Sequence, residues 1–231
     1  MEINAIEVNN LSVNYLGTPV LKNVNFEVPK AKMVGIIGPN GAGKSTLIKS
    51  MLGLIKSTGN ISMDGKLAYM KQGSDYDLSF PILVNEVVML GMYPSIGLFK
   101  RPKRRHRLLV EEALKRVGME DFGNRQIAEL SGGQWQRVLI ARILVQDADV
   151  IFLDEPFTGI DVDSEAHIVE ILREQWVAGK SIFIVHHNLD SATDYFDEVI
   201  LLNKSVIACG APPAVLTDEI LKDTYMRGDR M

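Results

Sequence analysis

The sequence has few of the features that mark secreted or membrane-spanning chains. Its 231 residues include a single cysteine, Cys209. A lone cysteine cannot form a disulfide within the chain, which is typical of a reducing compartment. No stretch approaches the roughly 20 consecutive apolar residues that a membrane-spanning helix requires. The first residues are not expected to form a signal peptide, because acidic Glu2 and Glu7 stand where such peptides are basic. Any role at a membrane is therefore expected to depend on a membrane-spanning partner, reached from the cytoplasm.

A strong excess of one charge is also missing. The 25 lysines and arginines are balanced by 29 aspartates and glutamates, so no general attraction to nucleic acid is expected. No cysteines, histidines and carboxylates have the spacing of metal ligands, so no metal site built by the protein alone is expected. The one dense basic run, residues 100–107, lacks interleaved aromatics. We expect a solvated lead-in to a helix. Contact with anionic lipid headgroups is the better of two functional alternatives, and nucleic acid is the other.

Short apolar runs bounded by turn residues alternate with longer segments of helical periodicity. Strands separated by helices of roughly 10–15 residues predict an α/β fold, with a parallel sheet covered by helices. Asp64-Gly65 suits the turn of a hairpin between two short strands. Strands are expected at residues 6–13, 20–28, 33–37, 150–154, 181–185 and 199–202, with two more between 60 and 70. Helices are expected at residues 44–52, 84–91, 107–117, 134–145 and 164–178.

Residues 38–45 read Gly-Pro-Asn-Gly-Ala-Gly-Lys-Ser and fit the phosphate-loop pattern G-x-x-x-x-G-K-[ST]. Glycines let the backbone curl so that successive N–H groups point at phosphate oxygens, and the following helix adds its positive end. Lys44 is expected to reach the β- and γ-phosphates, and the Ser45 hydroxyl to bind Mg²⁺. A chance match in a chain of this size is expected about once in a hundred. The expected nucleotide-binding residues here are Gly38, Pro39, Asn40, Gly41, Ala42, Gly43, Lys44, Ser45 and Thr46.

Two carboxylates lie at the end of the apolar strand expected at residues 150–154. Asp154 is expected to hold Mg²⁺, through water, as in other P-loop NTPases. Glu155 is expected to stand beside the attacking water as a general base. Taken by itself, such an acidic pair could equally well cap the helix that follows.

Leu-Ser-Gly-Gly-Gln at residues 130–134 leads into another expected helix and offers a second anion site. One chain that already has a phosphate loop has no obvious use for this site. In a second copy turned head-to-tail, each phosphate loop would face Ser131, Gly132, Gly133 and Gln134 of the other copy. The sequence therefore predicts a two-fold homodimer with two ATP molecules at the interface.

These motifs, in this order, resemble the ATPase subunits of ABC transporters over essentially the whole chain. The resemblance implies that Tyr15 stacks on adenine and that Gln72 contacts Mg²⁺, the water and the membrane subunit. It further implies that Asp161 links the two monomers and that His187 contacts the γ-phosphate. His187 is preferred to His186 because the family pattern places Asp or Asn and then Leu after the histidine. Taken alone, Tyr15 could be an ordinary aromatic residue of the core or of a turn, and Gln72 could be an ordinary amide on the surface. The expected catalytic residues are Glu155, His187, Lys44 and Gln72, and the expected Mg²⁺ ligands are Ser45, Gln72 and Asp154.

The same resemblance implies a single ABC ATPase domain over residues 1–231. Its nucleotide-binding core and N-terminal antiparallel β-subdomain would take residues 1–73 and 129–231. A helical subdomain would be inserted at residues 74–128. The implied partner is an integral membrane permease, docked by residues 74–82, which would hold the ATPase at the cytoplasmic face of the cell membrane.

Three segments, residues 74–82, 91–99 and 154–161, are similar to the ATPases of manganese, zinc and iron importers. That similarity implies import of a divalent metal ion delivered by an extracytoplasmic metal-binding protein. The alternatives are import of another cargo and a soluble ABC ATPase of DNA repair or translation. Soluble members usually carry long coiled coils or two ATPase units, and this chain has neither. A nucleotide binder without turnover is disfavoured because every catalytic position is filled.

Overall fold

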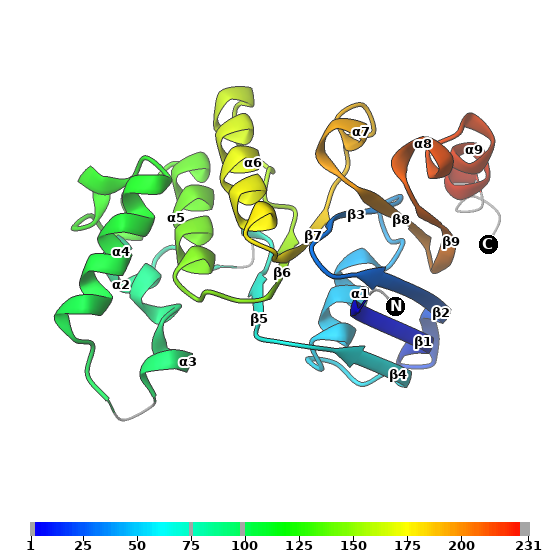
Figure 1. Ribbon diagram of the computed structural model, residues 1–231, viewed down its shortest axis with the longest axis horizontal. Coiled ribbons are helices and arrows are strands. Elements are labelled where there is room, and N and C mark those ends of the chain that lie inside the picture. The colour runs from blue at the N-terminus through cyan, green and yellow to red at the C-terminus, as the bar shows by residue number, and fades with distance from the viewer. Residues whose placement is uncertain (1–2, 74–75, 98–99, 227–231) are drawn as a thin grey trace.

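The computed structural model describes residues 3–73, 76–97 and 100–226. Two sheets lie side by side, and helices cover the larger one and extend beyond it (Figure 1). The strands are β1 (Asn4–Tyr15), β2 (Thr18–Pro29), β3 (Met33–Ile37), β4 (Thr58–Met63), β5 (Leu67–Met70), β6 (Val150–Asp154), β7 (Ser181–Val185), β8 (Glu198–Asn203) and β9 (Ser205–Gly210). The helices are α1 (Lys44–Met51), α2 (Val84–Leu90), α3 (Tyr93–Ile96), α4 (Arg104–Arg116), α5 (Gly132–Leu144), α6 (Val162–Val177), α7 (Ala192–Tyr195), α8 (Pro212–Val215) and α9 (Asp218–Met226).

The larger sheet has the strand order β5-β6-β7-β3-β8-β9, and only its β8–β9 pair is antiparallel. Alternate side chains of its buried strands point into two different cores, as the pleat of a strand requires. Val150 and Phe152 of β6 pack in one core with α1 and the antiparallel strands, whereas Ile151 and Leu153 pack in the other with α5 and α6. The predicted parallel sheet is confirmed. Because the carboxyl ends of parallel strands meet at one edge, the loops that follow β3, β6 and β7 gather there.

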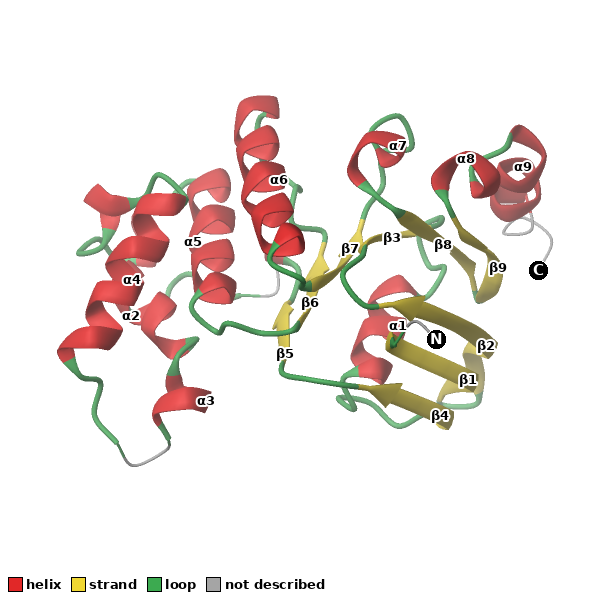
Figure 2. Cartoon of the chain, viewed as in Figure 1, coloured by secondary structure: helices red, strands yellow, loops and turns green. Residues whose placement is uncertain are grey.

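The smaller sheet is antiparallel, with the order β2-β1-β4. The hairpin predicted at Asp64-Gly65 is wrong. β4 pairs with β1, with Ile6 opposite Met63, but β5 leaves this sheet and pairs in parallel with β6. Asp64-Gly65 has the local chemistry of a tight turn, but the choice of strand partner depends on distant strands. The dipeptide therefore links the two sheets (Figure 2).

Helices α2, α3 and α4 come between β5 and α5 in the chain and form a lobe at one side of the molecule (Figure 1, left). Buried Val88 and Leu114 of α2 and α4 share a core with Val138 of α5, so the lobe packs on the helix that follows it. The boundaries 74–128 of a helical subdomain remain a prediction, and its first two residues, Ser74 and Asp75, lie outside the described residues. Within the ranges that the structure describes, no helix has the length and apolarity needed to cross a membrane.

The strands predicted at residues 33–37, 150–154 and 181–185 coincide with β3, β6 and β7. Three helices start earlier than predicted, and one of them is α6, which was expected from residue 164 and begins at Val162. The helix expected from residue 107 begins at Arg104, and the one expected from residue 134 begins at Gly132, directly after the capping residue Ser131. Strand β9 and the short helices α3, α7 and α8 were not predicted, nor was α9.

Candidate active site

The phosphate loop connects β3 to α1, and two of its glycines leave no room for a side chain. A Cβ on Gly38 would lie 2.0 Å from the Leu202 carbonyl oxygen, and a Cβ on Gly43 would lie 2.6 Å from Leu21 Cδ2. Gly43 also has a φ of 96°, which L side chains rarely adopt. The loop is therefore held against β2 and β8. The first N–H groups of α1 have no partner within the helix, so they are available to an anion.

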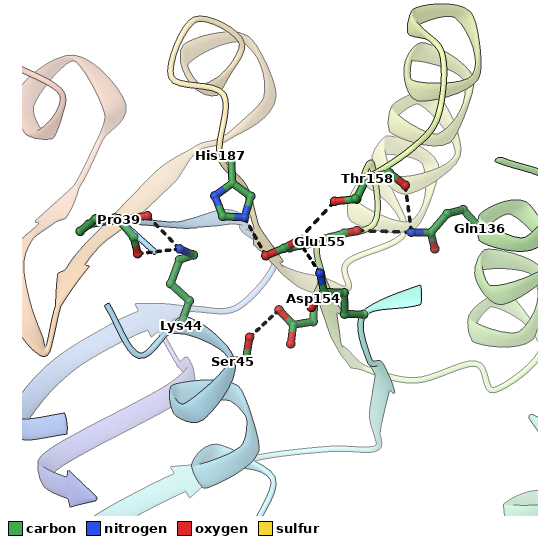
Figure 3. A network of polar contacts seen from close by, with 10 residues as sticks. Pro39, Lys44, Ser45, Gln136, Asp154, Glu155, Thr158 and His187 are labelled. Atoms are coloured by element: carbon green, nitrogen blue, oxygen red, sulfur yellow. Dashed lines mark hydrogen bonds and ion pairs between the residues drawn. The ribbon is translucent and has the colours of Figure 1, made fainter. Parts of the chain in front are cut away.

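Lys44 is buried at the start of α1, and its ammonium group lies over the loop (Figure 3). Nζ donates to the Gly38 carbonyl oxygen at 2.8 Å and to the Pro39 carbonyl oxygen at 3.0 Å. Burial lowers the pKa of Lys44, and the negative charges of Glu155 and Asp154 act in the opposite direction. The lysine thus lies between the phosphate loop and the two carboxylates at the end of β6.

Asp154 is the last residue of β6 and is almost fully buried. The Ser45 hydroxyl donates to Asp154 Oδ1 at 3.1 Å (Figure 3). Burial raises the pKa of Asp154, and the hydrogen bond from Ser45 counters part of that rise. A hydroxyl and a carboxylate at this distance are the oxygen ligands that Mg²⁺ prefers, so these residues fit a nucleotide-bound Mg²⁺.

Glu155 follows at a backbone φ of 54°, in the left-handed region that residues other than glycine rarely adopt. Three side chains contact the carboxylate. Gln72 Nε2 donates to Oε2 at 2.9 Å, Thr158 Oγ1 donates to Oε2 at 3.3 Å, and His187 Nε2 lies 2.7 Å from Oε1. A cavity of about 170 Å³ opens beside Glu155 and His187, which is ample room for a water molecule. Gln72 reaches this point from the end of β5 and His187 from the end of β7.

His186 is the neighbour of His187 but is buried and has different partners. Its Nε2 lies 2.8 Å from Ser191 Oγ, and its ring contacts Phe157, Tyr195 and Phe196 at centroid distances of 5.6, 5.8 and 5.5 Å. Burial lowers the pKa of His186 to about 4, and nearby His187 adds to the effect. The imidazole is therefore neutral near neutral pH.

The contacts that Thr158 and Gln136 make in the site were not anticipated from the sequence. Thr158 Oγ1 contacts the Glu155 carboxylate, and Gln136 Nε2 donates to the backbone oxygens of Glu155 and Thr158 at 3.4 and 3.5 Å. Gln136 follows the residue 130–134 motif on α5, which was the only sequence signal near it. Its side-chain amide therefore ties α5 to the loop after β6.

Ser131 caps α5 in the reciprocal arrangement known as a capping box. Its Oγ accepts from the Gln134 N–H at 3.3 Å, and Gln134 Oε1 accepts from the Ser131 N–H at 2.9 Å. Asp161 caps α6, since its carboxylate accepts from the N–H and the hydroxyl of Ser164 at 2.9 and 2.8 Å. Tyr15 lies at the end of β1 and is 46% exposed.

The structure therefore brings together only part of the predicted site. Lys44, Ser45, Asp154, Glu155 and their neighbours form one cluster (Figure 3). In the part of the chain that the structure describes, no hydrogen bond joins Ser131, Gly132, Gly133, Gln134, Asp161 or Tyr15 to the phosphate loop. Ser131 and Gly132 are exposed, so this predicted second anion site faces outward.

The family model for ABC transporters matches residues 21–158. The chain is 48% identical to the manganese transport system ATP-binding protein MntB of Halalkalibacterium halodurans, over 95% of this chain and 91% of that protein. The chain belongs to the ABC transporter family. It is also 44% identical to the zinc transport system ATP-binding protein TroB of Treponema pallidum, over 96% of this chain and 86% of that protein.

The fold of this ABC ATPase matches a solved ATP-binding cassette captured as a dimer in a post-hydrolysis state with ADP and phosphate. The TM-score is 0.80 and the identity 27%, over 90% of this chain and 98% of that one. The chain is thus an ATP-binding and ATP-hydrolysing subunit of an ABC transporter. ATPases of this family form dimers and work with a membrane permease. The predicted fold and family are confirmed.

Proposed function

We propose that this ATPase drives import of a divalent metal ion, of the manganese and zinc class, through a permease in the cell membrane. The observation that carries the proposal is the 48% identity to a manganese transport ATPase together with 44% identity to a zinc transport ATPase. An extracytoplasmic metal-binding protein would deliver the metal to the permease. The ATPase would lie at the cytoplasmic face, where ATP is available.

ATP binds along the edge where the loops after β3, β6 and β7 gather. Tyr15 stacks on the adenine, and the backbone N–H groups of residues 38–46 hold the phosphates. The Lys44 ammonium moves from the Gly38 and Pro39 carbonyl oxygens to the β- and γ-phosphates, because charged phosphate oxygens are stronger acceptors than neutral carbonyls. Ser45, Asp154 and Gln72 would hold Mg²⁺, which neutralises charge on the phosphates when bound.

Glu155 accepts a proton from the attacking water and is the general base of this mechanism. Gln72 and His187 fix both oxygens of its carboxylate, so that the carboxylate points into the small cavity beside them. His187 then positions the water against the γ-phosphate. Lys44 and the loop N–H groups stabilise the charge of the transferring phosphoryl group.

A second copy of the chain completes each site. Ser131, Gly132, Gly133 and Gln134 of one subunit face the γ-phosphate held by the other, and Asp161 lies at the contact between subunits. Their outward position and their lack of contact with the phosphate loop of the same chain support this arrangement. Closure of the dimer on ATP, and reopening after product release, would move the permease between its two states.

A groove of about 1130 Å³ in the helical lobe is proposed as the permease site. Phe80, Leu90 and Tyr93 line it and are 60%, 46% and 37% exposed. Exposed apolar side chains gathered in one groove are typical of a protein-binding surface. The groove begins within the predicted docking segment, residues 74–82. We propose that residues 74–128 form the helical subdomain and that its groove takes a cytoplasmic segment of the permease.

The proposal is tested by cellular metal content and uptake of manganese, zinc and iron. Cells lacking the protein are compared with cells in which the unaltered chain, or the Glu155→Gln variant, is restored. We expect loss of manganese or zinc uptake that the unaltered chain rescues and Glu155→Gln does not. Unchanged uptake of all three metals would contradict the proposal of metal import, whereas the assignment as an ABC ATPase would stand.

A further inference from the structure

The basic run that leads into α4 has no part in the ATPase site. Residues 100–107 hold 6 of the chain's 25 lysines and arginines and none of its 29 aspartates and glutamates. All six are exposed. Over the described ranges of the chain, no ion pair joins any of them to a carboxylate. Positive charge at the start of a helix is unfavourable for the helix dipole, so helix stability does not account for it.

Two leucines continue the same surface of α4. Leu108 and Leu109 are 54% and 51% exposed. They follow Arg104 and Arg105 by four positions each, so each leucine lies beside an arginine on the helix. Other residues of α4, among them His106, Val110 and Ala113, are buried and form its core side. Arg104, Arg105, Leu108 and Leu109 are called the basic–leucine face below.

This combination separates the possible partners. If the segment were exposed to water alone, two adjacent exposed leucines would not be expected beside its charges. Nucleic acid binding favours aromatic side chains on which bases stack, and residues 100–109 contain none. A membrane interface favours both parts, because cations pair with anionic headgroups while leucines enter the boundary with the acyl chains.

The position of the face agrees with a membrane partner. Arg101 and Arg107, from the same run, line the groove together with Phe80, Leu90 and Tyr93. The start of α4 lies at the end of the helical lobe that is remote from α1 and the phosphate loop (Figure 1, lower left). If the groove holds the permease, as proposed above, the face lies close to the bilayer. Charges act there without strong screening within about 8–10 Å.

We propose that the basic–leucine face binds anionic phospholipids of the membrane that contains the permease. The start of α4 is well suited to this role because it is fixed in place. The backbone N–H of Lys103 donates to Nδ1 of buried His106 at 3.0 Å. This hydrogen bond fixes the backbone at the point where the chain enters α4. The face would orient the ATPase on the bilayer through lipids, independently of its contact with the permease.

The test is co-sedimentation of the purified full chain with phosphatidylcholine vesicles, with and without phosphatidylglycerol. We expect binding only when phosphatidylglycerol is present. The double variant Arg104→Gln, Arg105→Gln should lower that binding about 20- to 30-fold, from the typical effect of two cations at an anionic surface. The matched control replaces two exposed lysines elsewhere, Lys56→Gln and Lys222→Gln, and should bind like the unaltered chain.

The leucines distinguish a lipid surface from a general polyanion site. Leu108→Gln with Leu109→Gln should weaken binding to the phosphatidylglycerol vesicles, although no charge is removed. ATP hydrolysis without membranes should be normal in all variants, which confirms that they fold. Equal binding to both kinds of vesicle, or normal binding of the arginine variant, would overturn the proposal. So would tighter binding to a single-stranded oligonucleotide that is unaffected by loss of the leucines. No permease is present, so these outcomes are independent of metal import.

Discussion

His187 Nε2 lies 2.7 Å from Glu155 Oε1. His187 is the second residue after the end of β7, and Glu155 is the first residue after the end of β6. The strands β6 and β7 are hydrogen-bonded in parallel, with Asp154 opposite Val185. This register brings Glu155 and His187 to the same edge of the sheet. A shift of one residue in either strand would turn the side chains of that strand to the other face of the sheet.

Replacement of Glu155 by Gln should remove the proposed general base and keep the shape of the site. We expect ATP hydrolysis to fall about 100- to 10,000-fold, the usual contribution of a general base. ATP binding should persist, so the variant should accumulate as an ATP-bound dimer. Phosphate release and size-exclusion chromatography with ATP measure the two effects. Glu170→Gln, on the exposed side of α6, is the control and should be fully active. Full activity of Glu155→Gln would show that Glu155 is not the general base.

Mixing two inactive variants tests the head-to-tail dimer. In Ser131→Arg a bulky cation blocks the second anion site, and in Lys44→Ala the phosphate loop loses its cation. Each homodimer should be almost inactive. A heterodimer of the two would keep one site with an intact Lys44 and an intact Ser131. An equal mixture should therefore regain up to about a quarter of normal hydrolysis. Normal hydrolysis by the Ser131→Arg homodimer would contradict the shared site.

Gly38→Ala should destabilise the protein because its new Cβ would meet the Leu202 carbonyl oxygen at 2.0 Å. Forcing the loop away from β8 should cost about 1–3 kcal/mol of unfolding free energy, as overpacking usually does. Nucleotide affinity should fall as well. Urea denaturation with and without ATP measures both. Gly53→Ala is the control, since Gly53 has a φ of 67° but no atom within 4 Å of its Cβ position. It should show backbone strain only and normal nucleotide affinity.

His186 should make stability depend on pH. Burial lowers its pKa from 6.5 to about 4, so the unfolded chain takes up a proton at a higher pH than the folded chain does. The contribution of His186 to the free energy of unfolding is fully present above pH 6.5 and is lost as the pH falls toward 4. The full loss corresponds to about 3 kcal/mol. Denaturation curves of the unaltered chain and His186→Gln, at about pH 7 and about pH 5, check it. The difference between the two pH values should shrink in the variant. An equal difference in both proteins would show that other groups cause the dependence.

The features that the sequence could predict are those fixed by local chemistry. The phosphate loop is recognisable because its glycines and Lys44 act within eight neighbouring residues, and the strands β3, β6 and β7 because they are apolar throughout. Features that depend on distant partners could not be predicted. Asp64-Gly65 has the chemistry of a hairpin turn, and only the pairing of β5 with β6 decides against it. The contacts of Gln136 and His186 likewise come from other elements. Strand β9 is half-buried and shows no clear alternation of polar and apolar residues.

The strand order has a consequence for how the chain is made. β3 carries the phosphate loop and comes early in the sequence, yet its two neighbours in the sheet are β7 and β8. During synthesis the loop would therefore emerge from the ribosome long before the strands that flank it have been made. Such long-range pairing is slow to form. A chain that stops after α5 would contain every residue of the phosphate loop and would still lack the sheet on which it rests. Nucleotide binding should accordingly appear only late in synthesis, once β8 has emerged.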